Sequence, residues 1–174
     1  MGAEQQTGRD RCQQQDADLE QQIADALTRT SRTAATAESL TGGSLSARLS
    51  AIPGASDWFV GGVVAYEETV KFQLLGVDRG PVITAQTAVQ MAEGVARLMN
   101  ADVAVATTGV GGPGPHENQP QGTVFLAVAI PGQTVVHEYH FAGDPPAVVK
   151  QSTQQALCDL LAAVANLCDD ASDR

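Results

Sequence analysis

Apolar residues follow two patterns along the chain, which together predict an alternation of strands and helices. Short runs of apolar, small or β-branched residues bounded by glycine, proline or polar residues are typical of strands. Such runs occupy residues 33–39, 59–66, 103–107, 123–130 and 134–141. The continuous apolar run at 103–107 suits a strand buried on both faces. The last two runs flank a Pro131-Gly132-Gln133 turn, which predicts an antiparallel hairpin.

Helices are predicted where apolar residues are spaced three or four positions apart. The first is expected to begin at Asp18, and its apolar stripe consists of Leu19, Ile23, Ala26 and Leu27. Further helices are predicted at residues 44–52, at 67–75, after the N-cap Thr84 and after the N-cap Asp144. Proline follows Asp144 twice, which fits the first turn of a helix because the N–H group that proline lacks is not needed there.

The order of these elements predicts one α/β domain whose mixed sheet has helices on both faces. A chain of 174 residues is long enough to bury one substantial core. Residues 18–168 are expected to form this domain. Before it, residues 1–17 are rich in glutamine and predict a disordered or frayed lead-in, and residues 169–174 form an acidic tail.

Composition and charge narrow the classes of function. The formal net charge is −10, and an acidic surface repels phosphate backbones, so nucleic-acid binding is not expected. No apolar run approaches the roughly 20 residues of a membrane helix, and the polar N-terminus lacks the apolar core of a secretory signal. Three cysteines without paired spacing, Cys12, Cys158 and Cys168, favour reduced thiols. These features predict a cytoplasmic protein that binds neither nucleic acid nor membranes.

The segment Ala37-Glu38-Ser39-Leu40-Thr41-Gly42-Gly43 puts a hydroxyl at the carboxyl end of a predicted strand, just before a helix. The N–H groups at a helix start favour negative charge, so such a position can hold a phosphate or a developing oxyanion. Ser39 is therefore a candidate nucleophile. The alternative is an ordinary strand-to-helix turn in which Ser39 or Thr41 is the N-cap.

Lysine is rare in this chain, which contains only Lys71 and Lys150. A lysine whose pKa is lowered by burial can act as a general base, and a Ser–Lys pair can hydrolyse an amide through an acyl-enzyme without a metal. Lys71, five residues after Tyr66, is the candidate for that role. Alternatively, Glu67 and Lys71 form an i,i+4 surface pair worth about 0.3–0.5 kcal/mol.

A third candidate is the glycine- and proline-rich loop over residues 109–122, which follows a buried strand. Glycine lets the backbone approach a ligand closely, and strand ends in open α/β sheets favour ligand crevices. The loop matches neither the P-loop nor the dinucleotide fingerprint, so a flexible surface loop is the alternative. His116 lies in this loop and His137 and His140 fall on opposite faces of a strand, so no metal set is expected.

Five segments together resemble one known family. They are TAESLTGG, WFVGGVVAYEETVKFQLLGV, TGVGGPG, QGTVFLAVA and FAGD, in this order. The chain is similar to the CinA C-terminal domain family over roughly residues 19–167, and stand-alone members of the PncC type are nicotinamide mononucleotide (NMN) deamidases. The resemblance implies a three-layer α/β/α sandwich with a mixed, mostly parallel sheet of anticodon-binding-domain-like topology, and a homodimer.

The resemblance also implies an activity and a set of site residues. The activity is hydrolysis of the NMN carboxamide to nicotinic acid mononucleotide and ammonia, with no cofactor or metal. By motif, Ser39 matches the nucleophile, Lys71 the general base and Tyr66 the tyrosine beside them. The matching substrate-binding positions are Thr41, Gly42, Gly43, Thr108 and Gly109.

The chain departs from the family's usual pattern at three places. Pro145 and Val149 stand where the family commonly has two arginines before its last helix. Glu68 replaces an amide, and Gln119 replaces a lysine. Two alternatives therefore stay open: a degenerate CinA-like domain that binds a nucleotide or a protein partner without turnover, and an amidase for a different small amide.

Overall fold

The computed structural model describes residues 16–172, which form six helices and five strands including one short 3₁₀ turn. The strands are β1 (Ala34–Glu38), β2 (Phe59–Val64), β3 (Val103–Gly109), β4 (Thr123–Ile130) and β5 (Gln133–His140). The helices are α2 (Asp16–Arg29), α3 (Ser44–Ser50), η1 (Ala55–Asp57, the 3₁₀ turn), α4 (Glu68–Leu74), α5 (Ala85–Met99) and α6 (Pro145–Ser172). Each strand and helix predicted from the sequence is present.

The strands form one sheet in the order β2-β1-β3-β4-β5. Strand β1 pairs in parallel with both β2 and β3, whereas β4 pairs antiparallel with β3 and β5. Only β4 therefore runs against the other strands, and the sheet is mixed and mostly parallel, as expected. The predicted hairpin of β4 and β5 is confirmed.

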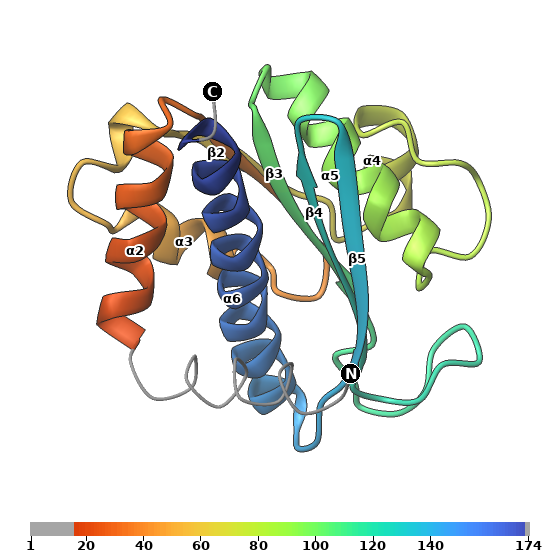
Figure 1. Cartoon of the computed structure of the whole chain (residues 1–174). Helices are drawn as coiled ribbons and strands as arrows, with labels where there is room; N and C mark the ends of the chain where they lie inside the picture. The colour runs from red at the N-terminus through yellow and green to blue at the C-terminus, as the bar shows by residue number, and fades with distance from the viewer. Residues whose placement is uncertain (1–15, 173–174) are drawn as a thin grey trace.

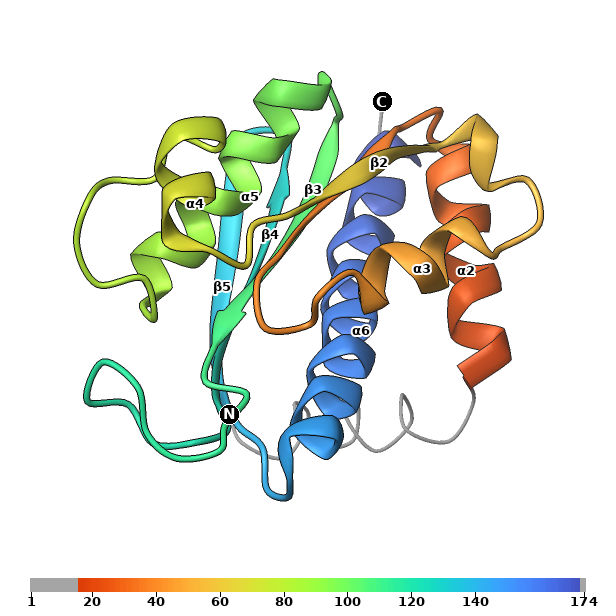
Figure 2. The same ribbon diagram turned by 180° about the vertical axis from the view of Figure 1, so that it is seen from behind.

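Helices cover both faces of the sheet, which confirms the three-layer sandwich (Figures 1 and 2). Helices α2, α3 and α6 lie on one face, and their apolar side chains share a core with alternate residues of β3 and β4 such as Val105 and Leu126. Helices α4 and α5 lie on the other face, over small residues such as Ala35 and Ala104. Strand β3 is buried on both faces except at its last residue, in agreement with its apolar sequence.

Three expectations need adjustment at the ends of the chain and at one cysteine. Helix α2 begins at Asp16 rather than Asp18, and α6 extends to Ser172, so the described part of the lead-in and tail is helical; the remainder of both lies outside the described residues. Cys158 is disulfide-bonded, so the expectation of reduced thiols is wrong for this residue, because spacing along a sequence does not show which sulfurs meet in space. No helix within residues 16–172 is long and apolar enough to cross a bilayer.

The register of the parallel strands brings three loops together at one edge of the sheet. Glu38 at the end of β1 pairs with Val64 of β2 on one side and with Thr107 of β3 on the other. The residues that follow these strand ends are therefore neighbours in space. The connection from β1 to β2 passes through α3 on one face of the sheet, and the connection from β2 to β3 passes through α4 and α5 on the other face. Strand β1 is therefore a topological switch point. Ligands commonly bind at such points in open α/β sheets.

Gly94 of α5 lets this helix pack closely against the end of α4. A Cβ atom at this position would overlap the carbonyl oxygen of Leu75 and lie 2.9 Å from its carbonyl carbon. Helix propensity alone favours Gly94→Ala by about 1 kcal/mol, but overpacking against backbone costs about 1–3 kcal/mol. We expect Gly94→Ala to lower the free energy of unfolding, measured in urea, while Gln86→Ala at an exposed site on α5 changes it by less than about 0.5 kcal/mol. A Gly94→Ala variant more stable than the wild type would contradict the close approach.

Candidate active site

A pocket of about 550 Å³ opens at the carboxyl ends of β1, β2 and β3. Its wall combines the residues that follow these strands with the loop after β3 and the first turns of α6. Among the lining residues are Ser39, Tyr66, Glu68, Lys71, Thr108 and His116. The pocket therefore lies at the switch point and contains the candidate nucleophile and the candidate base.

Ser39 follows the last residue of β1 and is 9% exposed on the pocket wall. Its N–H group donates to the carbonyl of Thr107 at 2.9 Å, which continues the pairing of β1 with β3. Its carbonyl accepts from the N–H of Gly42 at 3.1 Å, which closes a tight turn. Gly43, with φ 101°, occupies the N-cap position of α3, so the expectation that Ser39 or Thr41 is the N-cap is wrong.

Glu38, immediately before Ser39, is a residue that sequence reasoning missed. Its side chain is fully buried, and its two carboxylate oxygens accept five hydrogen bonds from the turn and from α3. The donors are the hydroxyl of Thr41 (2.7 Å), the N–H groups of Gly43 (3.0 Å), Leu45 (3.0 Å) and Ser46 (2.7 Å), and the hydroxyl of Ser46 (2.6 Å). The carboxylate thus holds the turn that carries Ser39. The signal in the sequence was an acidic residue inside an apolar strand.

Thr41, Gly42 and Gly43 build this turn, whereas Leu40 lines the pocket with Ser39. The hydroxyl of Thr41 is buried between Glu38 and Thr107, and its oxygen lies 2.8 Å from the Thr107 hydroxyl. Neither Thr41 nor its two glycine neighbours, Gly42 and Gly43, is among the residues that line the pocket. The structure shows a structural role for these residues, since the turn has positive φ at both glycines. Their contact with a substrate stays a prediction.

Lys71 of α4 is the largest fully buried side chain of the described chain, at 1% exposure. Its amine donates to the carbonyls of Ala65 at 2.7 Å and Tyr66 at 3.2 Å, the two residues that follow β2. Burial lowers the pKa of Lys71 below its usual value, and the nearby carboxylates of Glu68, Glu67 and Glu117 oppose this shift. The alternative of an exposed Glu67–Lys71 pair is wrong, because the amine turns inward to the backbone.

Ser39 and Lys71 line the same pocket. Within residues 16–172, no hydrogen bond joins the Ser39 hydroxyl to the Lys71 amine or to any other group. The hydroxyl is therefore free to meet a ligand. Catalytic hydrogen bonds are commonly long or unmade in structures without substrate, so this geometry fits a pair that closes on a bound molecule.

The other predicted site residues take different positions around the pocket. Tyr66 lines the rim with 74% of its surface exposed. Thr108 is buried, and its hydroxyl donates to the carbonyl of Val82 at 2.8 Å, which fixes the segment before α5. Gly109 also lines the pocket, and a Cβ atom there would overlap the carbonyl of Thr123, so the close packing of β3 on β4 requires glycine.

The sequence and the architecture have counterparts in known proteins. A model of the CinA C-terminal domain matches residues 16–164. The chain belongs to this family. A CinA-like protein of Frankia casuarinae is 41% identical to it over 147 residues, which are 82% of this chain and 34% of the relative. The chain spans about a third of the length of the curated relatives it matches.

Solved CinA structures have the same fold. A CinA superfamily protein of Klebsiella pneumoniae superposes with a TM-score of 0.82 at 32% identity, covering 86% of this chain and 97% of that one. A second, from Escherichia coli, gives a TM-score of 0.80 at 33% identity and covers 82% and 87% of the two chains. The fold of this CinA domain is thus shared along almost the whole of each solved chain.

Two positions at which the sequence departs from the usual CinA pattern line the pocket through α6. Pro145 and Val149 both contribute to its wall, and neither can bind an anion through its side chain. Glu68 lies on the opposite side, in the first turn of α4. The lining of this CinA pocket therefore contains no arginine among the residues that the structure describes.

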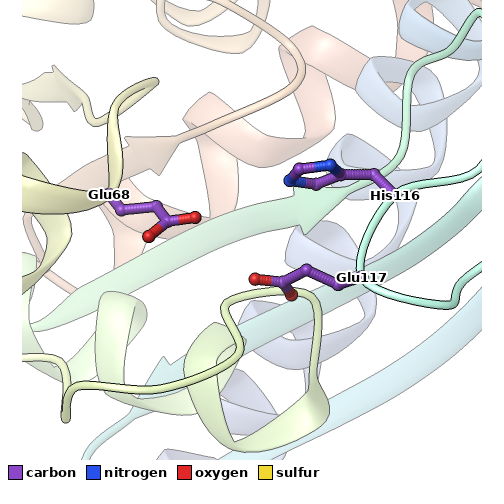
Figure 3. Close-up of side chains that lie close together, drawn as sticks. All are labelled: Glu68, His116 and Glu117. Carbon is purple, nitrogen blue, oxygen red and sulfur yellow. The ribbon is translucent and has the colours of Figure 1, made fainter.

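One group of side chains at the pocket could hold a metal ion: Glu68 and His116 line the pocket, and Glu117 lies next to them. The ligand atoms of Glu68, His116 and Glu117 all lie within 4.8 Å of one another, and the three side chains point toward a common space (Figure 3). The sequence prediction considered only the histidines as a set, and so it missed the approach of two carboxylates to His116. Glu68 and Glu117 are 49 positions apart, which is why no spacing signal revealed them.

The stability of the turn that carries Ser39 depends on both oxygens of the Glu38 carboxylate, which together accept five hydrogen bonds. We expect Glu38→Gln to lower the free energy of unfolding by about 3 kcal/mol or more, because the amide cannot accept on its nitrogen and leaves buried donors unsatisfied. Urea denaturation measures the effect, and Glu138→Gln on the exposed side of β5 is the matched control. Equal stability of Glu38→Gln and the wild type would show that the carboxylate charge is not needed.

Proposed function

We propose that this CinA domain is an amidohydrolase that converts NMN to nicotinic acid mononucleotide and ammonia through Ser39 and Lys71. The observation that carries the proposal is a free serine hydroxyl and a buried lysine amine on the wall of one pocket. Perturbed, buried ionisable groups in a cleft are typical of active sites. The carboxylates of Glu67 and Glu68 on the same wall suit the positive charge of a pyridinium ring.

The hydrogen bonds of Lys71 support a role as base. A neutral amine has two N–H donors and one lone pair, and the carbonyls of Ala65 and Tyr66 account for both donors. The lone pair is then available to accept the proton of Ser39. An ammonium group would instead present a third N–H to the pocket, and burial disfavours this form.

The reaction follows from these roles. The oxygen of Ser39 attacks the carboxamide carbon while Lys71 accepts the hydroxyl proton. The C–N bond then breaks, and Lys71 returns the proton to the departing ammonia. Water, deprotonated by the same amine, then attacks the acyl-enzyme; the ester bond to Ser39 breaks, Lys71 returns the proton to the Ser39 oxygen, and the product acid leaves and ionises to its carboxylate. Backbone N–H groups of the glycine loop at Gly111 and Gly112, which lines the pocket, are suited to stabilise the oxyanion.

A second candidate function is binding without turnover. It is favoured by one observation, the lack of a hydrogen bond between Ser39 and Lys71 within the described residues. A thermal-shift titration with NMN and a parallel assay for ammonia separate the two functions, because a binding module is stabilised by the mononucleotide and releases no ammonia.

The nucleophile and the base can be tested with matched controls. We expect Ser39→Ala and Lys71→Ala each to lower kcat for ammonia release from NMN by at least about 10³-fold, because each removes a group that forms or breaks a bond. Ser50→Ala on α3 and Lys150→Ala, the exposed second lysine, should retain the wild-type rate. Wild-type and Ser39→Ala rates that agree would exclude the serine mechanism.

The pH dependence tests the protonation state of Lys71. The base must be neutral, so kcat/KM should rise as pH increases through the pKa of Lys71, and burial puts this rise below the usual pKa of lysine. Because the Glu67 carboxylate raises the pKa of Lys71, Glu67→Gln should move the rise to lower pH. Lys71→Arg should be inactive at every pH, since arginine does not deprotonate. A profile that Glu67→Gln moves to higher pH would contradict the assignment of this limb to Lys71.

A further inference from the structure

We propose that Glu68, His116 and Glu117 form a site for a divalent transition-metal ion, and that this ion binds the anionic group of the substrate. The three side chains come from two elements on facing sides of the pocket: Glu68 from the first turn of α4, and the other two from the loop after β3. Their ligand atoms lie within 4.8 Å of one another and face one space (Figure 3).

The donors are held in place by contacts outside the group. The carboxylate of Glu117 accepts from the N–H groups of Val82 and Ile83, both at 2.8 Å, which anchors it beside the pocket. The loop that carries it is closed by reciprocal backbone hydrogen bonds between His116 and Gln119, at 3.0 and 2.8 Å. A carboxylate has about four lone-pair positions, so Glu117 can still bind a cation.

The donor types select the class of ion. An imidazole with two carboxylates suits Mn²⁺, Co²⁺ or Zn²⁺ better than Mg²⁺ or Ca²⁺, which prefer oxygen ligands alone. Donors about 2.0–2.2 Å from a shared ion are at most about 4.4 Å apart. Glu68 and His116 are exposed, so small side-chain rotations close the remaining gap. Three protein ligands leave coordination positions open for a substrate oxygen.

The negative charge around the pocket explains why an anionic substrate group would need a bound cation. Glu68 and Glu117 face each other, and no arginine lines the pocket among the residues that the structure describes. The lysine in the wall, Lys71, is turned to two backbone carbonyls. A phosphate entering this pocket therefore has no cationic side chain to bind, and it is repelled by two carboxylates. A divalent ion between those carboxylates reverses the local charge.

The binding of a substrate phosphate by the ion rests on the proposed function, which identifies that anion. The existence of the ion site does not rest on the proposed function. The ion binds the phosphate end of a mononucleotide, away from the carboxamide that Ser39 attacks. It therefore changes the binding of substrate and takes no part in breaking the C–N bond. In kinetic terms, the ion lowers KM.

The site is tested first without any substrate. The full chain is titrated with Co²⁺, whose visible absorption reports imidazole and carboxylate ligands, and the affinity is measured by calorimetry. We expect one ion per chain, and a loss of at least about tenfold in affinity in His116→Ala and in Glu68→Gln. His140→Ala is the matched control, because it removes an exposed imidazole that lies 3.2 Å from the Glu138 carboxylate on β5. Wild-type affinity in His116→Ala would overturn the site.

The role of the ion is tested with two substrates. After removal of metal with EDTA, addition of Mn²⁺ should lower KM for NMN by at least about tenfold and leave KM for nicotinamide riboside, which lacks the phosphate, unchanged. His116→Ala should abolish the effect of Mn²⁺. An identical KM for NMN with and without Mn²⁺ would overturn the binding role. Failure to hydrolyse either substrate would count against the proposed amidohydrolase alone, while the Co²⁺ titration would still decide the site.

Discussion

The burial of the Glu38 carboxylate is the constraint on which the serine turn depends. An ionised carboxylate inside a protein is costly unless hydrogen bonds replace its water, and within the described residues no basic side chain forms an ion pair with Glu38. Five donors from the turn and from α3 supply that replacement. The backbone around Ser39 is therefore shaped by the need to satisfy its neighbour.

Lys71 is the second ionisable side chain that is buried at the carboxyl end of the sheet. Glu38 and Lys71 are the charged side chains that are buried among the described residues. Glu38 ends β1, and Lys71 reaches from α4 to the residues that follow β2. Each is satisfied mainly by backbone groups, N–H donors for the carboxylate and carbonyls for the amine. The unfavourable burial of charge in this domain is thus concentrated where chemistry is proposed.

The strands, the helices and the three candidate loops were predictable because they depend on local patterns. The run at β3, the turn between β4 and β5 and the cap Asp144, which accepts from the N–H of Ala147 at 3.0 Å, each carry their signal in a few adjacent residues. The roles of Thr41 and Glu38 were not predictable, since they depend on which buried group needs a partner. The approach of Glu68 to His116 depends on the start of α4 meeting the loop after β3, which no spacing in the sequence encodes.

The two proposed catalytic side chains are attached to opposite layers of the sandwich. Ser39 leads into α3, whose residues share one core, while Lys71 lies on α4, beside the other. Ala35 and Ala37 of β1, the strand that leads to Ser39, pack in the core that α4 and α5 cover. A larger side chain at either alanine would overpack this core and displace the layer that carries Lys71 relative to β1. Two methyl groups away from the pocket thus constrain how its two walls are arranged.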